Sequence, residues 1–302
     1  MTSYVIKRIA SAILTVFLIA TLTFFLMNLV PGGPFASEKA PTPAVQAAME
    51  AKYGLDKPLI DQYGNYLNNL LHGDFGISLK QRGRSINEII GDTFPVSARI
   101  GGMAIIIALI FGVPMGSIAA LKRGKAWDNI IMVISTLGIA VPGFVLATFL
   151  MITFSGKLPT MGLYTSSSYI LPVFTLAFYP MAYITRLMRS SMLDVLSQDY
   201  IRTARAKGVS GPVILFKHAL RNAILPVITY LGPLLAYTLT GSFVVEKIFN
   251  IPGLGREFIK AINGRDYPMI MGVTIFLAVL LVVMNVLVDI AYRAVDPRIK
   301  LK

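Results

Sequence analysis

Cysteine is absent from this chain of 302 residues, and histidine occurs only as His72 and His218. Without thiolates, the chain forms neither a disulfide nor a cysteine-ligated metal site. Two histidines far apart in the sequence also argue against a histidine-based metal centre or catalytic triad. We therefore expect no metal ligands and no catalytic residues in this protein.

Charged residues are scarce as well, at 14% of the chain, whereas 55% of the residues are hydrophobic and the mean hydropathy is +0.68. One water-soluble core cannot bury that much apolar surface, so the composition is typical of an integral membrane protein. The net charge of +13 is compatible with nucleic-acid binding, but lysine and arginine in the cytoplasmic loops of a membrane protein produce the same excess. The positions of the charges decide between the two.

Six long apolar segments follow one another along the chain. The first contains 22 residues without a charge, enough at about 1.5 Å per residue to cross a hydrocarbon layer of roughly 30 Å. Lys7 and Arg8 precede it, as in a signal peptide, but the apolar run is too long and no small-residue cleavage site follows before Pro31. Prolines inside the later segments are expected to kink helices. The sequence predicts an all-α integral membrane protein with six transmembrane helices at 9–30, 98–121, 130–154, 170–187, 224–245 and 268–292.

Basic residues are distributed unevenly over the connections between these helices. The two termini and the second and fourth connections hold 16 of the 28 lysines and arginines but only 5 of the 15 acids. The net charge is therefore +11 on this side of the membrane and +2 on the other. Because positive loops are retained in the cytoplasm, we expect both termini and the fourth connection there. The basic excess then requires no nucleic acid.

A long external connection is expected between the first two helices. Within it, apolar residues recur at helical spacing from Leu59 to Leu71, and Gly73 follows as a stop. This pattern predicts a short amphipathic helix that lies on the membrane surface or caps the helix bundle. A ligand-binding role for this helix is the alternative.

The fourth connection is the most informative segment of the sequence. Residues 200–207 predict a short helix that Gly208 ends in the left-handed conformation. Ser210 or Gly211 then caps a second helix, with Pro212 in its first turn. The simplest interpretation of this helix-turn-helix bracket is a solvated basic loop. Alternatively, it docks another protein, since its small residues allow close approach and its basic residues supply charge: Thr203, Ala204, Ala206 and Gly208, and Arg202, Arg205 and Lys207.

The run Tyr-Ile-Arg-Thr-Ala-Arg-Ala-Lys-Gly at 200–208 resembles the cytoplasmic loop motif of ABC importer permeases, with Ala204 and Gly208 at its alanine and glycine positions. The wider family opens this motif with Glu-Ala-Ala, whereas Arg-Thr-Ala stands here, as in the peptide and nickel branch. Further stretches resemble the same branch, at 29–34, 53–58, 72–76, 241–255, 265–268 and 296–298. Together they resemble most the first permease subunit of oligopeptide importers. The permeases of dipeptide and nickel importers remain alternatives.

This resemblance implies the type I ABC importer permease fold and a place in a bacterial or archaeal cytoplasmic membrane. The implied partners are a second homologous permease, two cytoplasmic ATPases and an external substrate-binding protein, and the implied substrate is a peptide. ATP and magnesium are expected in the ATPases, because this chain has no Gly-x-x-x-x-Gly-Lys-Ser/Thr phosphate-binding loop and no cofactor of its own is expected. The implied organisation is a first helix at 1–30, an external loop at 31–95, a core permease domain at 96–292 with a coupling loop at 188–222, and a cytoplasmic tail at 293–302.

Three groups of candidate site residues follow from this interpretation. The ATPase-docking and coupling residues lie in the bracket: Arg202, Thr203, Ala204, Arg205, Ala206, Lys207, Gly208, Val209, Ser210, Lys217 and His218. A tight external turn before the last helix, in which proline presets φ and glycine supplies positive φ, is also a candidate gate and contains Pro252, Gly253 and Gly255. Candidates for the translocation path are polar or aromatic residues of the fifth helix: Thr229, Tyr230, Tyr237, Thr238, Thr240 and Ser242.

Asp289 is the one acid well inside a predicted helix, and an intramembrane carboxylate is a functional candidate. Arg293 follows four residues later on the same helical face, so an ion pair explains Asp289 structurally. An ion-coupled secondary transporter is the rival function, but it needs intramembrane coupling residues, and Asp289 stands nearly alone. An intramembrane protease would need a reactive pair or a metal motif, which the sequence lacks.

Overall fold

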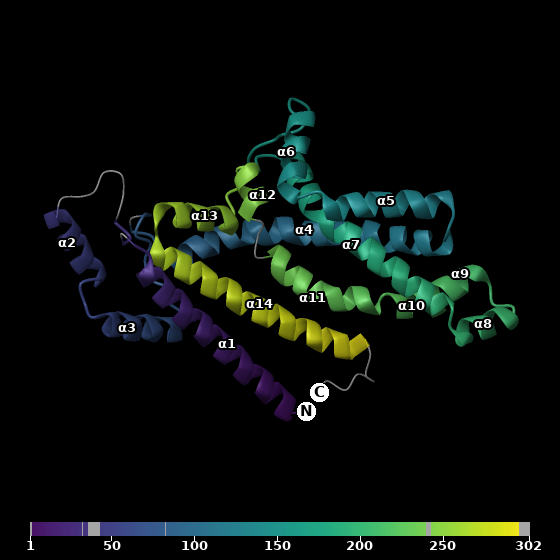
Figure 1. Cartoon of the computed structure of the whole chain (residues 1–302), viewed down its shortest axis with the longest axis horizontal. Coiled ribbons are helices and arrows are strands. Elements are labelled where there is room, and N and C mark those ends of the chain that lie inside the picture. Colours follow the sequence, from purple (N-terminus) through teal and green to yellow (C-terminus); the bar gives the residue numbers. More distant parts are fainter. Residues whose placement is uncertain (1, 32, 36–42, 82, 240–242, 296–302) are drawn as a thin grey trace. The chain divides into compact units, whose positions relative to one another are not determined.

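The computed structural model describes residues 2–31, 33–35, 43–81, 83–239 and 243–295 (Figure 1). This described part consists of helices and connecting loops, apart from one isolated antiparallel bridge between Ile77 and Ser85. The chain divides into two compact units, which are described one at a time. The first unit comprises 1–95 and 256–282, and the second comprises 96–255 and 283–300.

The helices follow the chain in the order that Figure 1 labels. The first unit contains α1 (Thr2–Leu29), α2 (Pro43–Tyr53) and α3 (Leu59–Leu71). Residues of both units occur in α4 (Ile86–Leu121), α13 (Leu254–Gly264) and α14 (Tyr267–Val295). The second unit contains α5 (Ala126–Ala140), α6 (Gly143–Thr153), η1 (Ser166–Tyr169), α7 (Ile170–Leu196), α8 (Asp199–Ala206), α9 (Gly211–Val213), the π-helix η2 (Ile214–Ala219), α10 (Leu220–Ala223), α11 (Leu225–Leu239) and α12 (Phe243–Ile248).

Within the part of the chain that the structure describes, four helical segments are long and apolar enough to cross a membrane: Arg8–Leu29, Ile86–Leu121, Ser166–Leu196 and Tyr267–Leu287. The bent pair α5 and α6 raises the number to five if it forms one span. Of the expected fifth segment, 224–245, the structure describes α11, in which Leu225–Leu235 is a shorter apolar helix, and the first residues of α12. The prediction of an all-α, multi-pass membrane protein is confirmed, but the prediction of six uninterrupted spans is not.

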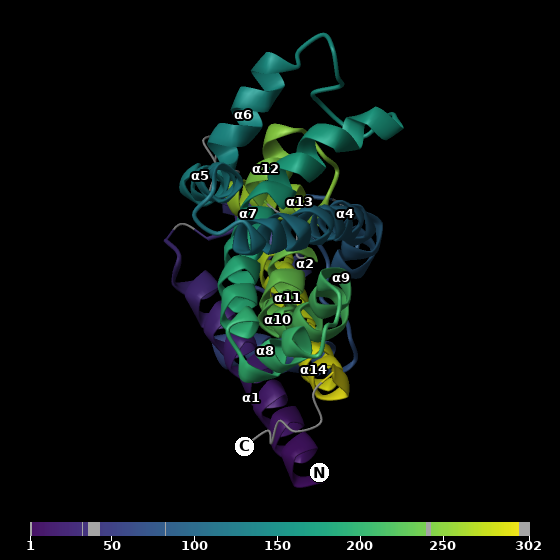
Figure 2. The same ribbon diagram turned by 90° about the vertical axis from the view of Figure 1, so that its right-hand side faces the viewer.

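The break between α5 and α6 has a local cause. The expected single helix at 130–154 bends by 105° between these two elements, and Figure 2 shows α6 turning away from α5. Val141 has an extended backbone because the residue before a proline avoids the helical region, and Pro142 has no N–H to donate. Among the prolines expected to kink helices, Pro142 therefore interrupts a span completely.

The predicted amphipathic helix is confirmed as α3, which packs against α1 within the first unit. The ring of Phe24 lies 5.3 Å from that of Tyr63 and 5.4 Å from that of Tyr66, and the hydroxyl groups of Thr21 and Tyr63 are 2.8 Å apart. Burial raises the pKa of Tyr66, so its phenol stays protonated. The helix stops at Gly73, whose φ of +74° permits the left-handed turn that the sequence predicts.

A buried carboxylate organises the other end of the first unit. Asp266, just before α14, accepts hydrogen bonds from the hydroxyl of Ser78 at 2.5 Å and from the backbone N–H of Leu79 at 3.1 Å. The neighbouring Arg265 donates to the carbonyl oxygen of Pro31 at 2.9 Å. These contacts join the segment after α1, the loop before α4 and the start of α14.

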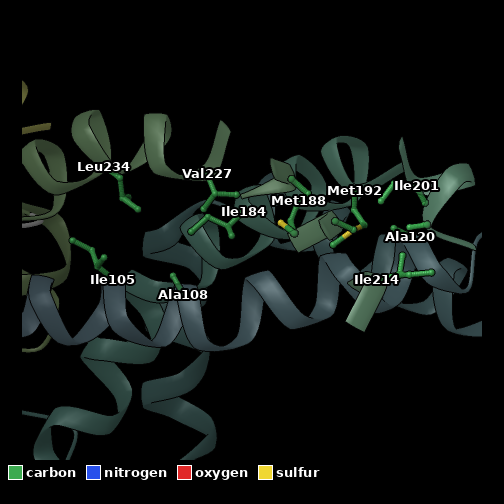
Figure 3. Close-up of a cluster of buried hydrophobic side chains, with 13 residues drawn as sticks. Ile105, Ala108, Ala120, Ile184, Met188, Met192, Ile201, Ile214, Val227 and Leu234 are labelled. Carbon is green, nitrogen blue, oxygen red and sulfur yellow. The ribbon is translucent and has the colours of Figure 1, made fainter. Parts of the chain in front are cut away.

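The second unit is built around α7, which packs closely against α4 and α5 because glycines line the contacts. A Cβ added at Gly116 of α4 would lie 2.5 Å from the carbonyl oxygen of Thr185, and one added at Gly138 of α5 would lie 2.6 Å from Cβ of Ala182. Small residues allow helix backbones in membranes to approach this closely. A cluster of buried hydrophobic side chains forms the core of this unit, and Figure 3 shows it. Its residues come from α4, α7, α8, η2, α10 and α11: Ile105, Ala108, Ala120, Ile184, Met188, Met192, Ile201, Ala204, Ile214, Ala219, Ala223, Val227 and Leu234.

Replacing Gly116 by alanine is expected to destabilise the second unit. The added Cβ meets the backbone of α7, so the helices separate at an overpacking cost of about 1–3 kcal/mol. The matched control is Gly102→Ala in the same helix, where no atom lies within 4 Å and alanine gains up to about 1 kcal/mol of helix propensity. Thermal unfolding in detergent measures both. Equal melting temperatures for the two variants would contradict this packing.

Candidate functional site

The bracket between α7 and α11 begins with a helix whose ending is fixed by hydrogen bonds. The N–H of Val209 donates to the carbonyl of Ala204 at 3.2 Å, and the N–H of Gly208 donates to that of Arg205 at 3.0 Å. This pair of bonds is the Schellman motif, which requires a left-handed residue after the helix. Gly208 meets the requirement with φ of +73°, as the sequence predicts. The four-residue spacing of Ala204 and Gly208 in the sequence is therefore the spacing that the Schellman motif requires.

The inner face of the bracket belongs to the core of the second unit. Ile201 and Ala204 of α8 and Ile214 of η2 are buried with Met188 and Met192 of α7 (Figure 3). Ala204 was expected among the small residues that another protein approaches. Its side chain instead packs inward, so Ala204 supports the bracket from within.

The outer face of the bracket is basic and exposed. Arg202 pairs with Asp199 at 3.5 Å, but both side chains are exposed and such a pair adds little stability. Val209 and His218 are partly buried. The remaining docking candidates all lie exposed on this face: Arg202, Thr203, Arg205, Ala206, Lys207, Gly208, Ser210 and Lys217.

Two exposed apolar side chains extend this face, and the sequence interpretation missed them. Phe216 of η2 is 68% exposed and Val213 of α9 is also exposed, next to Lys217. Phe216 lies in the π-helix at Ile214–Ala219, whose register differs from that of an α-helix, and Val213 directly precedes it. No short-range pattern in the sequence predicts a π-helix, so these positions could not be assigned to a face beforehand.

The second half of the bracket also differs from the expected capped helix. Ser210 occupies the N-cap position of α9 but its side chain makes no capping hydrogen bond. Pro212 lies in the first turn, as predicted. The two halves are joined by the side-chain amide of Asn222, which donates to the hydroxyl of Tyr200 at 2.8 Å. Figure 1 shows α8 and α9 together at the end of α7.

The turn at Pro252–Gly255 packs closely against a buried carboxylate. Glu246 of α12 is 1% exposed, and a Cβ added at Gly253 would lie 2.4 Å from its Oε2 atom, while one at Gly255 would lie 3.0 Å away. Ser97 Oγ accepts a hydrogen bond from the N–H of Leu254 at 2.9 Å. Glycine was expected here for positive φ; that reason is wrong, because the positive φ of this segment is at Asn250 and the glycines allow close approach instead.

Replacing Gly253 by alanine is expected to destabilise this turn. The new methyl group overlaps both Glu246 Oε2 and Ser97 Oγ, at 2.4 and 2.6 Å, which costs about 1–3 kcal/mol. The added substitution Ser97→Gly removes one of the two overlaps and should recover part of the loss. Thermal unfolding of the single and double variants measures this coupling. A Gly253→Ala variant as stable as the unaltered chain would contradict the assigned contacts.

The candidate path residues of α11 do not share one environment. Thr229 and Tyr237 are exposed, and Tyr230 is partly buried with its ring 4.4 Å from that of Tyr183 on α7. Thr238 is buried, so its side chain does not line an open path in this structure. Thr240 and Ser242 lie outside the described residues, as do the side chains of Asp289 and Arg293.

A second buried acid, missed in the sequence, joins α5 to α7. Arg189 donates to both carboxylate oxygens of Asp128, from Nε at 2.6 Å and from Nη2 at 2.8 Å. The N–H of Gly124 donates to the same carboxylate at 2.9 Å. Asp128 and Arg189 are far apart in the sequence, which is why spacing could not reveal the pair.

The helical spans, the glycine-packed unit around α7 and the bracket after it together define a membrane permease rather than an enzyme. Comparison with known families agrees: residues 112–301 match the family described as "Binding-protein-dependent transport system inner membrane component", and residues 1–101 match the N-terminal part described for such components. The chain belongs to this family. It is a permease subunit of an ABC importer, a type of transporter in which separate ATPase subunits hydrolyse ATP.

Curated relatives match over the full chain. The dipeptide transport system permease protein DppB of Bacillus subtilis is 51% identical over 100% of this chain and 99% of its own. The oligopeptide transport system permease protein OppB of Haemophilus influenzae is 45% identical over 99% of this chain and 100% of its own. Among solved structures, an inward-facing MetNI methionine ABC transporter chain has a TM-score of 0.59 at 17% identity, over 69% of this chain and 96% of that one. This last likeness shows that the fold is shared.

Proposed function

We propose that this chain is the permease through which a bacterial or archaeal importer carries peptides, oligopeptides in the first place, across the cytoplasmic membrane. Both termini and the bracket lie on the cytoplasmic side, as the basic excess of these segments requires. The full-length similarity to oligopeptide and dipeptide permeases supports peptide as the substrate class. The chain itself binds no metal or nucleotide, and ATP with magnesium acts in the partner ATPases.

The observation that carries this proposal is the bracket, whose outer face is basic and exposed and whose inner face is buried against α7. A partner that pushes on Arg202, Arg205 or Lys207 meets α8, which is anchored to α7 through Ile201 and Ala204. Because this core is close-packed, a force on the outer face displaces the helix behind it and is not absorbed locally. The bracket is therefore suited to couple closure of two ATPases to movement of α7 and α11.

The turn at Pro252–Gly255 acts as the external gate in this proposal. Its backbone packs against the buried carboxylate of Glu246 and donates a hydrogen bond to the hydroxyl of Ser97. A stiff turn moves as one piece when the helices around it move. An external binding protein delivers peptide on this side, and a second homologous permease completes the path. In this arrangement 31–95 is the external loop and 293–302 the cytoplasmic tail.

Reconstituted transport tests the proposal. The chain is assembled in proteoliposomes with its second permease, two ATPases and binding protein, and uptake of radiolabelled dipeptides and pentapeptides is measured. We expect peptide accumulation that requires ATP and the binding protein. Accumulation of nickel without peptide would assign the nickel branch instead. Uptake that persists on an ion gradient without the ATPases would overturn the proposal in favour of a secondary transporter.

The orientation is tested independently with single cysteines, because the natural chain has none. Ser210→Cys, on the exposed face of the bracket, should react with a membrane-impermeant thiol reagent applied to the cytoplasmic side of oriented vesicles. His72→Cys, after α3, is the matched control and should react from the opposite side. Labelling of Ser210→Cys from the outside would contradict the docking assignment.

A further inference from the structure

Four tyrosines gather on one side of α7 and α11, and with Thr229 we call them the tyrosine face: Tyr179, Tyr183, Tyr230, Tyr237 and Thr229. The rings of Tyr179 and Tyr183 are stacked with centroids 6.4 Å apart, and that of Tyr183 lies 4.4 Å from that of Tyr230. Tyr237 follows Tyr230 by two helical turns and thus lies on the same side of α11. Tyr179, Tyr183 and Tyr237 are 50%, 38% and 78% exposed.

The composition of this face is not that of a surface against lipid. Along α1 the large exposed side chains are aliphatic or phenyl, with Ile13, Leu18 and Leu22 among them, and the exposed hydroxyl of Thr15 donates to the carbonyl of Ser11 within the helix. From its middle onward, α7 instead exposes Tyr179, Tyr183, Arg186, Ser190 and Asp194, and the exposed side chains that the structure describes on α11 are Thr229, Pro233 and Tyr237. Tyrosines that anchor proteins at the membrane surface lie at the ends of spans, whereas Tyr179 and Tyr183 lie halfway along Ser166–Leu196. Hydroxyl and guanidinium groups on an exposed helix face favour water or a polar ligand over lipid chains.

The face also differs from a packed contact between helices. Where α7 approaches α4 and α5 most closely, the contacts involve small residues, as Gly138 against Ala182 and Gly116 against Thr185. Small residues are what membrane helix interfaces use generally. Ala182 and Tyr183 are adjacent in the sequence, and the first is buried while the second is exposed. One side of α7 is thus built for close packing, and the other presents large, amphipathic rings.

We infer that the tyrosine face binds the peptide during its passage, with Tyr183 at its centre; this inference rests on the proposed function. Tyrosine rings offer apolar faces to side chains of any sequence, and their hydroxyls both donate and accept hydrogen bonds, as a peptide backbone demands. Pro233 has no N–H to donate to the carbonyl of Thr229, which leaves that carbonyl free of its usual helical partner. Arg186 follows Tyr183 on the same exposed stripe and offers a bidentate partner to a peptide carboxylate.

Cysteine labelling in the assembled importer tests the inference. Tyr183→Cys is made in the naturally cysteine-free chain, and a membrane-impermeant maleimide is applied in proteoliposomes with ATP and binding protein. We expect labelling with the peptide-free binding protein and at least fivefold slower labelling with the peptide-loaded one. Val133→Cys, on the exposed aliphatic side of α5, is the matched control and should stay unlabelled in both cases.

The outcomes separate this inference from the proposed function. Labelling of Tyr183→Cys in the isolated chain but not in the assembly would mean that the second permease covers the face, which overturns the inference even where peptide uptake is intact. Labelling without protection by peptide also overturns it. Kinetics give a second readout: Tyr183→Leu should raise the KM for peptide at least fivefold, Tyr183→Phe less, and Val133→Leu not at all. An unchanged KM for Tyr183→Leu counts against the assignment.

Discussion

Gly208→Ala is expected to reduce ATP-driven peptide uptake about fivefold or more while the chain still inserts into the membrane at normal levels. Gly208 has φ of +73°, and an alanine held in this left-handed region costs about 1–2 kcal/mol. That strain shifts the bracket from its native turn to other conformations by a factor of about 5 to 30. Nothing lies within 4 Å of an added Cβ, so the effect arises from the backbone and not from a clash within the chain.

Three further variants make this prediction specific. Gly208→Asn should retain most of the uptake, because asparagine tolerates the left-handed conformation. Gly211→Ala is the matched control, since Gly211 is exposed, has open space around it and does not have positive φ. Gly208→Trp adds bulk on the docking face and should uncouple ATP hydrolysis from uptake. Normal coupling in Gly208→Trp, or equal uptake in Gly208→Ala and Gly211→Ala, would count against the bracket as the docking element.

The bracket shows how far local sequence patterns reach. The helix at α8 and its stop at Gly208 were predictable because the Schellman motif depends on neighbouring residues alone. The inward direction of Ala204 was not, since it depends on Met188 and Met192 of another helix. The π-helix that follows, and with it the exposure of Phe216, depends on how the chain returns to the membrane. Local chemistry therefore predicted the turn, and tertiary packing decided which residues face outward.

The same division holds for the spans and for the turn before α13. Apolar length predicted where the long helices lie, but Val141 and Pro142 turned one predicted helix into two. At Gly253 the sequence predicted a glycine-dependent turn, and the physical reason was different. Gly253 is needed because the turn lies close to Glu246, and no hydropathy pattern indicates that Glu246 is buried. Buried acids such as Asp128, Glu246 and Asp266 were invisible because their partners come from elsewhere in the fold.

Removing the carboxylate of Asp128 is expected to be the most destabilising single change in the second unit. Asp128 is buried, and both of its oxygens accept hydrogen bonds from Arg189, with a further bond from Gly124. Breaking a buried ion pair from one side typically costs about 3 kcal/mol or more, because the remaining charge loses its partner. Asp128→Asn should therefore lower the melting temperature markedly. Peptide uptake should fall with it, since α7, which leads into the bracket, loses its fixed position against α5.

An exposed ion pair in the same chain provides the control. Arg84 and Asp92 also contact each other, but their side chains are 42% and 69% exposed, so Asp92→Asn should cost less than about 1 kcal/mol. A double-mutant cycle completes the test: Asp128→Leu with Arg189→Met removes both charges and should be less destabilised than the sum of the single variants. Thermal unfolding of the chain in detergent supplies these values. If Asp128→Asn and Asp92→Asn unfold at the same temperature, the Asp128–Arg189 pair does not hold α5 to α7.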